Sequence, residues 1–102
     1  MEHKRTVDWM CIGIEKLSDT DTHVDYAFVS DVRERDPRYR SRSVIVGQNR
    51  GRLRIMKATG DVTLLEPMPE DEESKRFQRA AARIKKHWDA HEFPDKTMFA
   101  CG

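Results

Sequence analysis

Apolar side chains recur at helical spacing in one stretch of this sequence, residues 69–92, and that limits the folds the chain can adopt. Pro69 suits the first turn of a helix, where its missing amide hydrogen leaves no carbonyl unpaired, and Pro94 ends the pattern. A single amphipathic helix needs another element to cover its stripe, so we expect the preceding residues to supply that surface. The stripe consists of Phe77, Ala80, Ala81, Ile84, Trp88 and His91.

The residues before this helix alternate as strands do, and turn-forming residues divide them. Residues 23–30 place Val24, Tyr26 and Phe28 on one face, which is typical of a half-buried strand. Glycine and asparagine within residues 47–51 favour a tight turn between two strands. We place strands at about residues 6–17, 23–30, 39–46, 52–58 and 62–66, the helix at 69–92 and a tail at 94–102. Residues 96–102 of this tail are apolar enough to dock as a short sixth strand.

Short connections between consecutive strands make neighbouring strands antiparallel. The sequence therefore predicts an α+β fold, in which an antiparallel meander sheet of about five strands has one C-terminal amphipathic helix packed on one face. A length of 102 residues fits one domain, residues 1–102.

Charge is distributed in bands along the chain, although the net charge is only +1. Residues 33–57 contain nine basic and two acidic side chains, whereas residues 58–74 contain six acidic side chains and no basic one. A patch of one sign can attract a charged partner, and bands of opposite sign can also neutralise each other within the fold. The sequence leaves both uses open.

Five arginines in the basic band form the candidate binding site, which we call the arginine patch. Residues two apart on a strand share a face, so each of the two expected strands would present a row of guanidinium groups. If the two rows lie on one face, like charges crowd together, and an anionic partner would relieve them. The arginine patch consists of Arg38, Arg40, Arg42, Arg52 and Arg54.

We expect the partner to be another protein with an acidic or mixed surface, because the planar guanidinium group makes paired hydrogen bonds and is common in interfaces. The chain would then act as an adaptor, an inhibitor or a regulatory subunit. The alternative is a module that binds the backbone of RNA or single-stranded DNA, although base-stacking aromatic residues are not evident beside the arginines. A solvated face with internal ion pairs remains the plainest interpretation. The nucleic-acid alternative would also use a basic stripe on the helix, formed by Lys75, Arg79, Arg83 and Lys86.

Sequence motifs for catalysis or for a cofactor are absent, so we expect a non-enzymatic protein without a cofactor, and a small enzyme or a metal site is the third alternative. His87 and His91 lie four residues apart on the expected helix, a spacing that lets two imidazoles reach one metal ion. No further ligand follows the spacing of a known metal motif, so we interpret both as ordinary helix residues. Cys11 lies in an apolar strand and is expected to be a reduced, unreactive thiol.

The longest stretch without a charged residue is Ser43–Asn49, which is far shorter than the about 20 residues that a membrane-spanning helix needs. We therefore expect a cytoplasmic protein without a membrane partner, and reduced Cys11 and Cys101 would fit that compartment. A disulfide between these two cysteines is the alternative. A strand at the edge of the sheet leaves a homodimer open.

Overall fold

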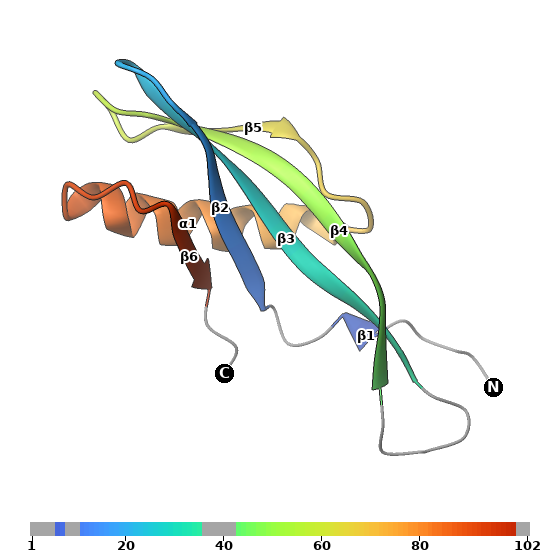
Figure 1. Cartoon of the computed structure of the whole chain (residues 1–102). Helices are drawn as coiled ribbons and strands as arrows, with labels where there is room; N and C mark the ends of the chain where they lie inside the picture. The colour runs from blue at the N-terminus through green and yellow to red at the C-terminus, as the bar shows by residue number, and fades with distance from the viewer. Residues whose placement is uncertain (1–5, 8–10, 36–42, 100–102) are drawn as a thin grey trace.

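A helix lies across one face of an antiparallel sheet, and none of the helices or strands that the structure describes covers the opposite face, which we call the open face (Figure 1). This computed structural model describes residues 6–7, 11–35 and 43–99. The elements are β1 (Thr6–Val7), β2 (Ile12–Asp19), β3 (His23–Arg35), β4 (Ser43–Met56), β5 (Val62–Glu66), a 3-10 turn η1 (Glu72–Ser74), α1 (Lys75–Asp89) and β6 (Lys96–Phe99).

The strand order β5-β4-β3-β2-β6 confirms the predicted α+β fold with an antiparallel sheet and a C-terminal helix. Strands β2 to β5 follow one another as a meander. Of the two expectations for the C-terminal segment, the short sixth strand is confirmed: it forms β6, which pairs antiparallel with β2 at the other side of the sheet. The short β1 pairs with β3 through Val7 and Val32.

The core forms where alternate strand residues meet the helix. Val24, Tyr26 and Phe28 are fully buried, as the alternation of residues 23–30 predicts. Ala80 and Ile84 bring the helix stripe onto them. Each large apolar side chain removed from water contributes about 1.5–3 kcal/mol, so this layer holds α1 on the sheet. Ile12, Ile14, Leu53, Ile55 and Met68 complete the buried cluster.

The two expected strands at residues 39–46 and 52–58 differ from the structure, because residues 47–51 continue one long strand, β4. Gly51 lies opposite Phe28 in the β3–β4 ladder, and a Cβ atom on it would clash with the Cζ atom of that ring. The glycine that resembles a turn residue is therefore needed for packing. The charged residues after Ser30, expected to form a connection, extend β3 to Arg35.

The helix begins at Lys75, six residues later than expected, because Glu73 and Ser74 both have a φ of 55°. The buried carboxylate of Asp71 accepts hydrogen bonds from the backbone amides of Arg76 (2.8 Å) and Phe77 (3.0 Å). It thus satisfies amides of the first helical turn in the way an N-cap side chain does.

The other end of α1 closes with a Schellman motif. The amide of His91 donates to the Trp88 carbonyl and the amide of Glu92 to the His87 carbonyl, each at 2.9 Å. This arrangement places His91 in the left-handed region, with a φ of 59°. Trp88 then contacts the turn between β4 and β5, where its Nε1 atom donates to the Lys57 carbonyl at 2.8 Å.

No helix in the described part of the chain is both long and apolar enough to cross a membrane.

Candidate functional site: the open face of the sheet

The face of the sheet opposite α1 carries the basic side chains of β4. Leu53 and Ile55 point toward the helix and are fully buried. Because side chains alternate along a strand, Arg50, Arg52 and Arg54 share the open face. These three arginines come from one strand rather than from two neighbouring ones.

Carboxylates of the same chain lie within reach of all three arginines. Arg52 Nε lies 2.8 Å from a carboxylate oxygen of Glu66. Arg54 donates two hydrogen bonds to Asp25, at 2.7 Å from Nε and 3.1 Å from Nη2. These hydrogen bonds lower the pKa of the Asp25 carboxyl below its ordinary value.

The structure describes only two of the five residues of the arginine patch. Arg38, Arg40 and Arg42 lie outside the described residues, so their part in the patch stays a prediction. Arg52 and Arg54 share a face, as the patch requires. Each already pairs with an acid of its own chain, however, so the like-charge crowding that motivated the patch is absent at these two positions.

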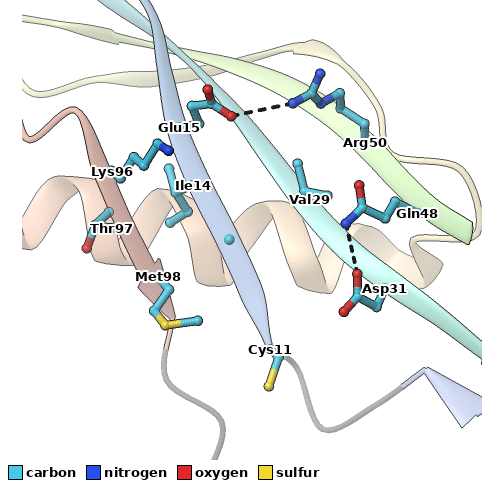
Figure 2. Close-up of a pocket in the computed structure, with 11 residues that line it drawn as sticks. Cys11, Ile14, Glu15, Val29, Asp31, Gln48, Arg50, Lys96, Thr97 and Met98 are labelled. Atoms are coloured by element: carbon cyan, nitrogen blue, oxygen red, sulfur yellow. Dashed lines mark hydrogen bonds and ion pairs between the residues drawn. The ribbon is translucent and has the colours of Figure 1, made fainter. Parts of the chain in front are cut away.

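A shallow pocket of about 390 Å³ lies on the open face, where β6, β2, β3 and β4 run side by side (Figure 2). Its floor is formed by Gly13 and Val29, which are directly opposite each other in the β2–β3 ladder. The atom nearest to a Cβ atom on Gly13 would be the Val29 carbonyl oxygen, at 4.0 Å. The absence of a side chain at Gly13 therefore leaves empty space above the floor of the pocket. The pocket is lined by Cys11, Gly13, Ile14, Glu15, Val29, Asp31, Gln48, Arg50, Lys96, Thr97 and Met98.

The rim of the pocket combines one exposed apolar side chain with two basic side chains, one in a long ion pair and one without an ion pair to any described residue. Met98, which pairs with Gly13 across β2 and β6, is 52% exposed. Arg50 lies 3.6 Å from Glu15, and its side chain is 59% exposed. Lys96 makes no ion pair with any residue that the structure describes. Two cationic groups at the rim can therefore accept a carboxylate from outside.

At the other end of the pocket, Gln48 Nε2 donates a hydrogen bond to Asp31 at 3.0 Å, from β4 to β3 (Figure 2). This amide–carboxylate pair closes the end with neutral and acidic groups. The pocket thus has two cations and the carboxylate of Glu15 at one end, and Asp31 with Gln48 at the other, with an apolar floor between them.

No family model, curated protein or solved structure matches the chain.

The basic helix stripe lies on a different surface from these arginines. Lys75, Arg79 and Lys86 are exposed on α1, which covers the face of the sheet opposite the pocket (Figure 1). Arg83 is half-buried, and the guanidinium group of Arg79 lies 5.6 Å from the centre of the Phe99 ring. The stripe and the open face therefore do not form one continuous basic surface.

His87 and His91 do not share a face of the helix. His87 Nε2 lies 2.9 Å from the Thr97 hydroxyl, which ties α1 to β6. His91 follows the end of α1 in the left-handed conformation, so the four-residue spacing places no two imidazoles side by side. Within the described residues, no three His, Cys, Asp or Glu side chains are grouped as a metal site would require.

Cys11 is disulfide-bonded, so the expectation of a reduced thiol is wrong for this residue. An apolar strand context alone cannot distinguish a buried thiol from one that is paired with a cysteine distant in the sequence. Cys101, the other cysteine of the sequence, lies outside the described residues.

Gly13, Lys96 and Met98 are not among the site residues that the sequence predicts. They join one pocket only because β6 pairs with β2, a contact between segments more than 80 residues apart. Arg50 belongs to the basic band, but the expected turn at residues 47–51 removed it from the strand. No local signal in the sequence indicates the β2–β6 pairing.

Proposed function

We propose that the chain is a non-enzymatic protein-binding module that docks its partner on the open face of the sheet. The observation that carries this proposal is the pocket, whose apolar floor at Gly13 and Val29 is bordered by the cations Arg50 and Lys96. Interfaces commonly combine an apolar anchor in a pocket with a polar rim.

The chemistry of the pocket indicates what the partner would contribute. An apolar side chain would fill the space above Gly13 and contact Met98, which is exposed. A neighbouring carboxylate would bind Lys96 and the exposed guanidinium group of Arg50. This agrees with the expectation of an acidic or mixed partner surface, and it moves the centre of the site from Arg52 and Arg54 to the pocket beside them.

A nucleic-acid backbone has less support as the ligand. Binding a polyanion depends on cations that can replace its counterions. On this face the acids Glu15, Asp25 and Glu66 each lie within ion-pair distance of an arginine. A run of phosphate contacts along this face would have to compete with all three acids, whereas one partner carboxylate could bind Lys96 and would compete with an acid only at Arg50, where Glu15 lies 3.6 Å away.

The test is capture of a partner from native lysate before and after nuclease treatment, comparing variants of the immobilised protein. Gly13→Leu would fill the pocket and should abolish capture, whereas Thr63→Leu adds the same side chain at an exposed position of β5 outside the pocket and should leave capture intact. Both variants should keep the wild-type circular dichroism spectrum. Equal capture by the two variants would refute the pocket as the docking site, and loss of all captured material with nuclease would favour the nucleic-acid alternative.

A further inference from the structure

The long strand β4 is paired on both sides over only part of its length. The β3–β4 ladder extends from Ser43 to Met56, but β5 pairs with only Arg52 to Ile55. Among the strands that the structure describes, none pairs with the second edge of residues 43–51 (Figure 1). An unpaired edge presents backbone N–H and C=O groups that can continue the sheet with another chain.

The sequence of residues 43–49 favours pairing of this edge with a strand of another chain, because it contains no charged residue that would repel that strand. Ser43–Asn49 is the longest stretch of the chain without a charged residue, and it contains three consecutive β-branched residues. Val46 is 50% exposed. Natural proteins usually protect such edges with charged residues, proline or bulges, and this edge has one bulge at Val46 and no charge before Arg50.

We propose that this edge pairs antiparallel with the same edge of a second copy of the chain, about a two-fold axis at Gln48. In such a pair, residues equally far from the axis on either side lie opposite each other. Arg50 would then lie opposite Val46 of the second copy, and its aliphatic stem would cover that exposed side chain. An axis at Arg50 itself would instead oppose two guanidinium groups, which is unfavourable.

The second copy is favoured as the occupant because identical strands meet their own charges. In a two-fold pair a residue meets its own copy only on the axis; with the axis at the uncharged Gln48, the single charged residue of residues 46–50, Arg50, lies opposite Val46 and meets no like charge. Opposite residues in an antiparallel ladder point to the same side, so the axis is perpendicular to the sheet. The open faces of the two copies would form one surface with a pocket on each half.

The test is sedimentation equilibrium of the full chain over a concentration series, with two variants at the exposed Val46. Wild type should reach the mass of a dimer. Val46→Lys should dissociate it, because each lysine would face Arg50 of the other copy. Val46→Glu should keep the dimer, because each glutamate would face the same arginine with opposite charge. Two such contacts per dimer predict at least about a tenfold difference in dissociation constant between the variants.

Several results would overturn this proposal. They are a wild-type mass of one chain at every concentration, masses above a dimer, or equal dissociation constants for Val46→Lys and Val46→Glu. Circular dichroism of both variants checks that they are folded, and the half-exposed position of Val46 should tolerate either charge. The proposal is independent of the partner-binding function, because a dimer can form in purified protein without any ligand.

Discussion

The ring of Phe28 occupies the space where a side chain of Gly51 would stand, so its Cζ atom would clash with a Cβ atom at that position. The two residues are directly opposite on β3 and β4, and Phe28 also lies 6.2 Å, between ring centres, from Phe77 of α1. The glycine therefore determines how closely the helix layer approaches the sheet.

Replacing Gly51 by alanine should destabilise the protein by about 1–3 kcal/mol, because the Phe28 ring must move within a packed core. The measurement is the free energy of unfolding in urea. Gly47→Ala is the matched control on the same strand, because no atom lies within 4 Å of a Cβ atom there. A loss of stability in Gly47→Ala as large as in Gly51→Ala would contradict this explanation.

His91→Gly should stabilise the protein by about 1 kcal/mol, because glycine adopts the left-handed conformation at the end of α1 without steric cost. The thermal midpoint of unfolding should rise accordingly. Ala90→Gly, one residue earlier at a φ of −89°, should lower it. A fall in the midpoint for His91→Gly would mean that the exposed imidazole makes contacts that outweigh the backbone strain.

Asp71→Ala should cost about 1–2 kcal/mol, because the amides of Arg76 and Phe77 lose their hydrogen-bond acceptor. Glu72→Ala, which removes an exposed carboxylate of the same acidic run, should change the free energy of unfolding by less than about 0.5 kcal/mol. Chemical denaturation of the two variants in parallel distinguishes a capping role from a general effect of negative charge near the helix.

The hydrogen bonds from Arg54 make stability depend on pH through Asp25. Its carboxyl has a pKa below the ordinary value of 3.8, so the folded protein binds this proton less readily than the unfolded chain does. The resulting stabilisation is fully present above about pH 5 and is lost as the pH falls through the lowered pKa. Asp25→Asn should be less stable than wild type at neutral pH, and the difference should shrink in acid. Thermal midpoints measured from pH 7 to pH 2 would show whether the two curves converge; parallel curves would exclude this contribution.

The alternation of apolar residues in the strands and their helical spacing in α1 predicted the fold class, because each pattern shows which face of an element is buried. They predicted Val24, Tyr26 and Phe28 as one face, and Ile84 and Trp88 as part of the helix stripe. They could not place Gly51, because glycine serves equally in a turn and beneath an aromatic ring. They also missed the late start of α1, where an acidic run that suits a first helical turn adopts left-handed conformations instead.

The candidate site was harder to predict than the fold. A pocket made of Gly13, Val29 and Met98 depends on strand order and register, and neither follows from the local sequence. The ion pair between Arg54 and Asp25 likewise depends on which residues the β3–β4 ladder places opposite each other. Counting charges along the chain therefore overestimated how much positive charge is free on the sheet.

The pairing of β6 with β2 also bears on how the molecule is made. The meander from β2 to β5 can form from neighbouring segments as they are synthesised, but Gly13 meets Met98 only after residue 98 has been translated, 85 residues later. A nascent chain halted before residue 96 would have an incomplete pocket, because β6 contributes Lys96, Thr97 and Met98 to its lining. A partner that binds this pocket would accordingly recognise only chains in which β6 has been synthesised and paired with β2.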